Sequence, residues 1–219
     1  MKRLVIFDLD GTLLNTIADL SAATNYALQT CGFPVHDIDS YRYFVGNGIT
    51  KLIERALPEA NRSKADIEKI RSLFISYYNE HNVDLSAPYP GIEHLLGKLQ
   101  AEHVLLAVAS NKYQEATSKL VKHYFPGIAF AAVLGQRDGV PTKPDPRIVN
   151  EIIGTCNLTH KDTVYVGDSN VDMQTGKNAQ VTTIGVSWGF RSCVELQAYH
   201  PDCIADKPCD ILNFLGITD

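Results

Sequence analysis

Five short runs of apolar, strand-forming residues recur along the chain, separated by longer polar stretches. They lie at residues 4–7, 104–109, 131–134, 163–166 and 181–186. Each run is continuous rather than alternating, which is typical of strands buried on both faces of a parallel sheet. Because the stretches between them read as helices or loops, the chain is predicted to be an α/β protein with a doubly wound parallel sheet.

The interval between the first and second runs is unusually long and reads as helical throughout. Apolar residues recur there at helical spacing, with stop signals at Gly32 and Pro58 and a helix start at Ser63. A single crossover between two strands does not need three helices. We therefore expect an inserted all-helical module at residues 17–83, attached to an α/β core made of residues 1–16 and 84–219.

The composition and the net charge of the chain indicate what kind of partner the protein binds. The chain has 219 residues, of which 45% are hydrophobic and 21% charged, as expected for one well-cored domain plus a smaller module. Its formal net charge of −5 gives no basic footprint for nucleic acid or for an anionic membrane surface. A small-molecule partner is therefore expected.

The cysteines and the apolar segments indicate the compartment. The five cysteines are scattered and contain no C-x-x-C pair, which is typical of reduced thiols in a cytosolic protein. Asp8 interrupts the first apolar run after four residues, too early for the core of a secretory signal. No apolar run approaches the ~20 residues of a spanning helix, so a cytoplasmic protein is expected.

Two acidic residues, Asp8 and Asp10, close the first apolar run in the stretch "VIFDLDGT". Side chains alternate along an extended backbone, so both project from the same side. At ~5 Å their carboxylates would repel by roughly 3 kcal/mol at an effective dielectric of 20. An isolated D-x-D-G is more often a solvated turn, and only polar residues at other strand ends favour a functional cluster.

Such polar residues follow the other predicted strands. Ser110 follows the second run, Asp168 and Asp172 follow the run at 163–166, and Lys143 lies in a proline-framed loop. Ser110 and nearby amides could bind a phosphate oxygen. Alternatively, Ser110 and the two acids could simply cap helices, and Lys143 could be surface charge. Ligands of parallel sheets bind beyond the carboxyl ends of the strands, which favours one shared site.

An assembly of four acids and one lysine would be unstable without a cation. Oxygen ligands with no histidine or cysteine nearby favour Mg²⁺, which takes one or two carboxylates and keeps several waters while binding a phosphate. Lys143 would add a fixed positive charge for a phosphoryl group. One carboxylate could then attack phosphorus while another moves a proton.

Four motifs of the chain resemble those of a known protein family. "FDLDGTLLNT", "ASN" at 109–111, Lys143 and "VGDSNVDM" occur in the order and spacing typical of the haloacid dehalogenase superfamily. The chain resembles its Mg²⁺-dependent phosphatase branch, and the helical module is similar to the cap of the subgroup with phosphoglycolate phosphatases and β-phosphoglucomutases. The resemblance implies a phosphomonoester hydrolase that acts on a small phosphorylated metabolite.

The resemblance also implies roles for the acids. Asp8 would be the nucleophile that forms an aspartyl-phosphate. Asp10 would protonate the leaving alcohol and later deprotonate the attacking water. Mg²⁺ would be held by Asp8, the main-chain carbonyl of Asp10 and Asp168, with Asp172 in a supporting position.

Further residues would hold the phosphoryl group. On the same resemblance, Ser110, Asn111 and Lys143 would clamp its oxygens, where charge spreads in the transition state. Gly11 and Thr12 would shape the loop around the metal and the phosphate.

The stretch "YRYFVGNGITKLIERAL" is expected to select the leaving group. Gly46 and Gly48 would let a loop approach the site, and Asn47, Lys51 and Arg42 are available to a substrate carboxylate or hydroxyl. The same residues could merely form a turn between two helices. "VGNG" and the later "GVSWGFR" resemble phosphoglycolate phosphatases, which implies hydrolysis of 2-phosphoglycolate to glycolate and phosphate.

Other functions stay open at this point. The rivals are a phosphatase for pyrophosphate, a nucleotide or a sugar phosphate, a β-phosphoglucomutase-like mutase, and a non-enzymatic phosphate-binding module. A receiver-like module needs neither a leaving-group acid such as Asp10 nor a helical insert, so these features favour an enzyme.

Overall fold

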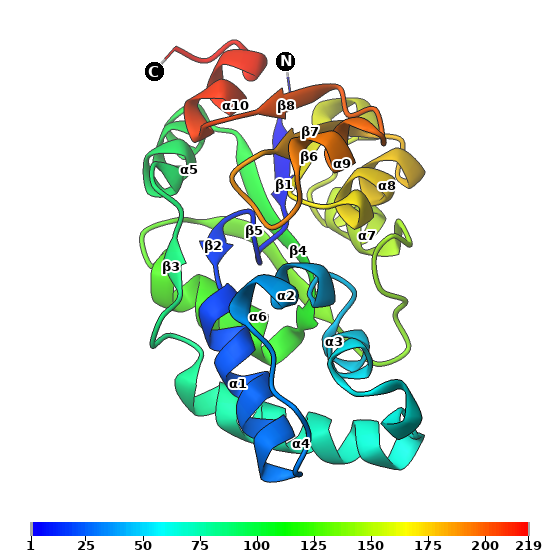
Figure 1. Ribbon diagram of the computed structural model, residues 1–219. Coiled ribbons are helices and arrows are strands. Elements are labelled where there is room, and N and C mark those ends of the chain that lie inside the picture. Colours follow the sequence, from blue (N-terminus) through cyan, green and yellow to red (C-terminus); the bar gives the residue numbers. More distant parts are fainter. Residues whose placement is uncertain (1, 219) are drawn as a thin grey trace.

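The computed structural model describes residues 2–218 and contains a six-stranded parallel sheet. The strand order is β5-β4-β1-β6-β7-β8, and every neighbouring pair is parallel (Figure 1). The strands are β1 (Leu4–Phe7), β4 (Leu105–Tyr113), β5 (Phe130–Gln136), β6 (Thr163–Gly167), β7 (Thr182–Val186) and β8 (Cys203–Ala205). The α/β prediction is confirmed, with β8 as a strand that the apolar runs did not reveal.

Helices cover both faces of this sheet, as the continuous apolar strands require. The helices are α5 (Ile92–Ala101), α6 (Gln114–Tyr124), α7 (Arg147–Thr155), α8 (Asn170–Asn178), α9 (Cys193–Gln197) and α10 (Pro208–Leu215), with a 3₁₀ turn η2 (His160–Asp162). Val5 and Phe7 pack with α5, α6 and α10, while Leu4 and Ile6 pack with α7 on the other face. The alternation of β1 side chains thus builds two cores, one on each face.

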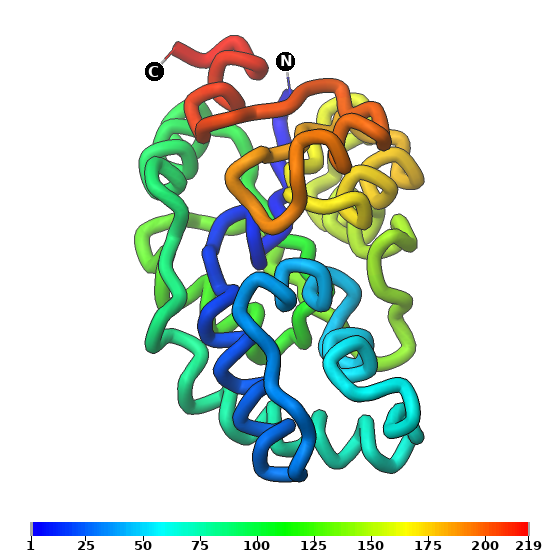
Figure 2. The backbone as a smooth tube through the Cα atoms, viewed as in Figure 1, coloured from blue at the N-terminus to red at the C-terminus, as the bar shows by residue number. Residues whose placement is uncertain are grey.

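A group of helices lies between β1 and β4 in the sequence. It comprises α1 (Ile17–Thr30), α2 (Ile38–Phe44), α3 (Ile49–Ala56), the 3₁₀ turn η1 (Glu59–Asn61) and α4 (Lys64–His81). Its members share their own apolar cluster, in which Tyr41, Ile53 and Phe74 are buried. Ser63 caps α4 by accepting a hydrogen bond from the Asp66 amide at 3.1 Å, as the sequence predicted. Figure 2 shows these helices at one end of the molecule and both termini at the other.

The two segments that connect these helices to the sheet run side by side. β2 (Leu14–Asn15) pairs antiparallel with β3 (Ala87–Pro88). Nearby, the buried Asp19 carboxylate accepts hydrogen bonds from the amides of Leu85 and Ser86 and from the Ser86 hydroxyl. An unpaired buried carboxylate would be costly, so these bonds fix where the chain leaves the sheet and returns to it.

No helix within residues 2–218 is long and apolar enough to cross a membrane. The cysteines at 31, 156, 193, 203 and 209 are all free thiols.

Candidate active site

The carboxyl ends of three adjacent strands bring the predicted residues together. Asp8 follows β1, Ser110 and Asn111 lie near the end of β4, and Asp168 follows β6. Since β4, β1 and β6 are neighbours and parallel, these residues share one edge of the sheet. Lys143 reaches the same edge from the loop between β5 and α7.

Lys143 is at the centre of the cluster. Its side chain is 2% exposed, and its Nζ lies 2.7 Å from Asp8 Oδ1 and 2.7 Å from Asp172 Oδ1. It also donates to the Ala109 carbonyl at 3.0 Å and to the Tyr165 hydroxyl at 3.0 Å. Burial alone would lower the pKa of Lys143, but the carboxylates of Asp172 and Asp8 outweigh it and raise that pKa well above the usual value. The ammonium is therefore a fixed positive charge.

Asn111 holds the Lys143 loop in place. Its Oδ1 accepts from the Lys143 amide at 2.8 Å, and its Nδ2 donates to the Lys143 carbonyl at 3.2 Å. The same Nδ2 donates to the Gly46 carbonyl at 2.9 Å. Asn111 therefore ties the sheet edge both to the lysine loop and to the segment before α3. The amide also lines the cavity described below.

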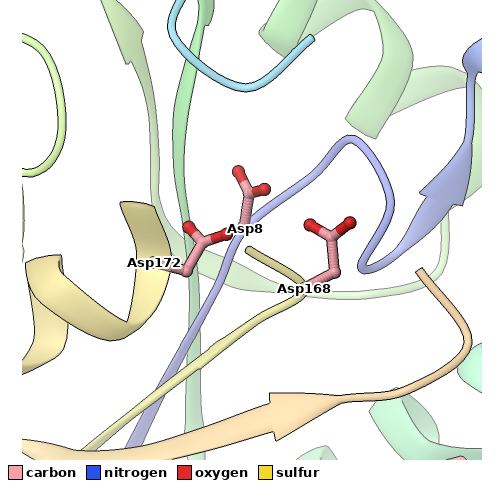
Figure 3. A group of neighbouring side chains, drawn as sticks. All are labelled: Asp8, Asp168 and Asp172. Atoms are coloured by element: carbon pink, nitrogen blue, oxygen red, sulfur yellow. The ribbon is translucent and has the colours of Figure 1, made fainter. Parts of the chain in front are cut away.

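Asp8, Asp168 and Asp172 form a buried carboxylate triad, shown in Figure 3. One oxygen from each lies within 4.8 Å of the others. Burial and the Asp172 carboxylate raise the pKa of Asp8 to about 7, although Lys143 acts in the opposite direction. Burial, Asp172 and Asp8 likewise raise the pKa of Asp168 well above its usual value. The triad therefore holds more negative charge than one lysine balances.

The triad could hold a divalent metal ion. It offers three hard oxygen donors at one point of the sheet edge, with no nitrogen or sulfur donor among the group. Oxygen-only ligands of this kind suit Mg²⁺ or Ca²⁺ rather than softer metals. A divalent cation there would also relieve the repulsion that raises the two pKa values.

Asp172 has two roles, including the one that the sequence offered as an alternative. Its Oδ2 accepts from the Ser169 amide at 3.1 Å and from the Ser169 hydroxyl, which closes a capping box at the start of α8. Its Oδ1 pairs with Lys143. Asp172 thus anchors the helix and orients the lysine at the same time.

Asp168 is enclosed by two glycines. A Cβ at Gly11 would lie 2.2 Å from Asp168 Oδ2, and one at Gly189 would lie 2.2 Å from Asp168 Cβ. Gly11 also has a φ of +89°, a conformation that side chains rarely adopt. Asp168 Oδ2 accepts from the Phe190 amide at 2.7 Å. The carboxylate is therefore held in one position beside Asp8.

Asp10 lies in a different environment from Asp8. Both of its carboxylate oxygens lie 3.0 Å from Lys112 Nζ, and Oδ1 also accepts from the Thr16 hydroxyl at 2.7 Å. Its side chain is 12% exposed, whereas that of Lys112 is 4% exposed. Two acids that are one residue apart thus have separate cationic partners, Lys143 for Asp8 and Lys112 for Asp10.

A cavity lies between the sheet edge and the helices of residues 17–81. Its empty space, open mouth included, is about 630 Å³. The sheet side contributes Asp8, Asp10, Ser110 and Asp168. The helical side is mostly apolar and contributes Leu20, Val45, Ile49, Leu52 and Phe74, and the loop residues Gly46 and Gly48 also line it.

Three polar residues proposed from the sequence for the leaving group are placed elsewhere. Asn47 does not line the cavity, and its Oδ1 accepts from Arg55 at 2.8 Å. The Lys51 side chain is 55% exposed and pairs with Glu54 at 2.6 Å. Arg42 is likewise exposed on α2. Thr12, predicted to shape the loop, is fully buried, and its carbonyl accepts from the Trp188 indole at 3.0 Å.

Several residues of the site cannot be recognised from the sequence. Lys112 and Arg191 line the cavity. Lys112 directly follows the "ASN" motif and Arg191 ends the stretch "GVSWGFR", but nothing in the sequence shows their partners. Thr16 binds Asp10, and Tyr165 binds Lys143. Tyr78 lines the cavity from α4 and reads in the sequence as an ordinary core aromatic.

Comparison with known proteins places this arrangement in a family. The sequence model of "Haloacid dehalogenase-like hydrolase" matches residues 5–186. A phosphoglycolate phosphatase from Psychrobacter arcticus is 32% identical, covering 98% of this chain and 96% of that protein. One from Mesorhizobium japonicum is 33% identical, covering 86% and 84%. A solved structure from Lactobacillus delbrueckii subsp. bulgaricus, 32% identical, superposes with a TM-score of 0.90 over 98% of this chain and 99% of that one. This chain belongs to the haloacid dehalogenase-like hydrolase family.

Proposed function

We propose that this protein is a Mg²⁺-dependent phosphatase that hydrolyses 2-phosphoglycolate to glycolate and phosphate through an aspartyl-phosphate on Asp8. The observation that carries the proposal is the Asp8 carboxylate, held by Lys143 at 2.7 Å inside a triad of buried acids. The phosphoglycolate phosphatases at 32% and 33% identity support the choice of substrate.

Asp8, Asp168 and the main-chain carbonyl of Asp10 are the groups that would hold the metal ion, with Asp172 in support through Lys143. When bound, Mg²⁺ would supply positive charge to the acid cluster and to the oxygens of the transferring phosphoryl group. Gly11 and Gly189 leave Asp168 no room to swing away from this position.

Asp8 acts as the nucleophile. One of its carboxylate oxygens forms a bond to phosphorus while the bond from phosphorus to the leaving alcohol breaks. Lys143 and the Ser110 hydroxyl lie at the same edge and stabilise the charge that spreads over the phosphoryl oxygens. Asn111 acts indirectly, because its amide keeps the Lys143 backbone in register with β4.

Asp10 moves the protons. It gives a proton to the oxygen of the leaving alcohol and then takes one from the water that hydrolyses the aspartyl-phosphate. Lys112 and Thr16 hold its carboxylate at the cavity wall. Separate partners for Asp8 and Asp10 let one remain an attacking carboxylate while the other cycles between acid and base.

Residues 17–83 are proposed as a cap over a core of residues 1–16 and 84–219. The cavity between the sheet edge and α1, α3 and α4, with its apolar wall, supports this division. Closure of the cap would exclude water during attack by Asp8, and opening would admit substrate and release product. The paired segments β2 and β3 are the natural hinge, because the chain passes between core and cap there.

A panel of phosphate esters tests the proposal. With Mg²⁺ we expect release of inorganic phosphate, with the highest kcat/KM on 2-phosphoglycolate, and no release after chelation of the metal. Asp8→Asn, which keeps the side-chain shape, is the matched control and should be inactive. Release from no ester, or isomerisation of a sugar phosphate without release of phosphate, would overturn the proposal.

A further inference from the structure

Arg191 lines the cavity and carries a buried donor that has no partner within the described residues. It follows β7, its side chain is 8% exposed, and it lines the cavity. Nη2 donates to the Val45 carbonyl at 3.0 Å, and Nε lies 3.4 Å from Glu195 Oε1. Nη1 is buried and has no hydrogen-bond partner among residues 2–218. Native proteins leave few buried donors unpaired, because each loses its hydration without compensation.

Tyr78 makes a second, independent observation on the same cavity. It comes from α4, is fully buried, and its hydroxyl also has no partner within the described residues. Its ring lies 4.8 Å from Lys112 Nζ. Two residues that line one cavity, from different elements, therefore each carry a buried polar atom without a partner among residues 2–218, which points to a polar ligand there.

The charged side chains that line the cavity indicate the charge of that ligand. Away from Asp8, Asp10 and Asp168, the charged groups of the cavity are Lys112 and Arg191, both cationic. Lys112 is already paired with Asp10. The surrounding side chains are largely apolar, so an anion beside Arg191 would meet little competition from water. A carboxylate is a good match, because guanidinium groups bind it with strong, directional hydrogen bonds.

We propose that Arg191 binds a carboxylate on the leaving group, and that the substrates are therefore phosphate monoesters of small hydroxy acids. This inference rests on the proposed phosphatase function. The phosphoryl group lies over Asp8, and the acid end of the same molecule accepts a hydrogen bond from Arg191 Nη1, with the Tyr78 hydroxyl as a further donor. Specificity then comes from a core loop after β7 rather than from Asn47 or Lys51.

Two esters and four variants form the test. 2-Phosphoglycolate is compared with 2-hydroxyethyl phosphate, in which a hydroxymethyl group replaces the carboxylate. The measured quantity is the ratio of kcat/KM for the acidic ester to that for the neutral ester. Arg191→Met should lower this ratio roughly 10- to 100-fold, the range for a lost charge-assisted hydrogen bond, mainly through KM of the acidic ester.

The matched controls are Arg55→Met and Lys51→Met. Arg55 donates to the Phe44 carbonyl at 2.9 Å, as Arg191 donates to Val45, but it does not line the cavity. Neither control should change the ratio. Tyr78→Phe, which removes only an oxygen atom, should lower it by roughly 3- to 10-fold, and it provides the test if Arg191→Met does not fold.

The outcomes distinguish a failure of this inference from a failure of the proposed phosphatase function. If Arg191→Met lowers kcat/KM equally on both esters, Arg191 only anchors the loop and does not bind the carboxylate, which refutes the inference. If Lys51→Met changes the ratio, the substrate carboxylate is bound by the cap instead, which also refutes it. Wild-type protein that cleaves both esters equally would refute the inference and leave the phosphatase in place. Cleavage of neither ester would refute the phosphatase proposal, and this inference with it.

Discussion

Replacing Lys143 with methionine removes the one cation from the acid triad while keeping a similar side-chain length. In the structure the ammonium group lies 2.7 Å from a carboxylate oxygen of Asp8 and 2.7 Å from one of Asp172, and all three side chains are buried. The variant therefore leaves two carboxylates without their charged partner. It also removes the donor to the Tyr165 hydroxyl at 3.0 Å.

The loss of stability should be large. Removal of one partner from a buried ion pair costs about 3–5 kcal/mol, and Lys143 serves two carboxylates, which favours the upper end of that range. Without the lysine, the pKa of Asp8 rises further, because Lys143 no longer opposes the effect of burial and of Asp172. The native state then keeps a proton that the unfolded chain has lost. The deficit should therefore grow between pH 5 and pH 8, by up to about 1.4 kcal/mol per pH unit for each proton.

Urea unfolding of the metal-free protein at both pH values measures this deficit. Lys112→Met is the matched control, because Lys112 is also buried but pairs with one carboxylate, that of Asp10, which is more exposed and keeps the Thr16 hydrogen bond. We expect the control to lose about 1.5–3 kcal/mol, the scale of a hydrogen bond to a charged group. Equal losses in the two variants, with no dependence on pH, would refute the view that Lys143 offsets part of the negative charge of the triad.

Two further predictions concern the metal and its surroundings. In metal-free protein the pKa of Asp8 is raised to about 7 by burial and by a neighbouring carboxylate. The native state thus holds a proton that the unfolded state loses near pH 4, and stability should fall from about pH 4 to pH 7. Thermal unfolding should show this fall in EDTA and a much smaller one with Mg²⁺, whereas identical profiles would argue against metal binding by Asp8 and Asp168. Gly11→Ala should weaken Mg²⁺ binding, because the added Cβ would press on the Asp168 carboxylate. Gly32→Ala is the control, because Gly32 also has a positive φ but has open space around it. This variant should lose stability without losing Mg²⁺ affinity in a calorimetric titration. Equal Mg²⁺ affinities in both variants would contradict this account.

The sheet and its functional edge could be predicted because both follow from local pattern. Continuous apolar runs mark doubly covered strands, and the carboxyl ends of neighbouring parallel strands meet at one edge. The sequence therefore predicts that Asp8, Ser110 and Asp168 lie together at this edge. β8 escaped because Cys203–Ala205 is short and only partly buried, so it has no continuous apolar run.

The partners within the site could not be predicted, since they depend on how distant elements pack. Lys112 and Arg191 read as ordinary charged residues until the fold brings them to the cavity wall. Lys51 illustrates the reverse. On α3 the buried residues are Leu52, Ile53 and Ala56, so Lys51 lies on the opposite, exposed face, and helical periodicity could have indicated this orientation.

The covalent intermediate on Asp8 is the central claim, and one measurement tests it most directly. The Asp10→Asn variant, which lacks the group that activates water, is mixed with Mg²⁺ and p-nitrophenyl phosphate, whose leaving group needs no acid. After an acid quench, the peptide that carries Asp8 is analysed by mass spectrometry. We predict about one phosphoryl group per chain, located on Asp8. Release of p-nitrophenol with no phosphorylated protein, or a phosphoryl group on another residue, would contradict the account.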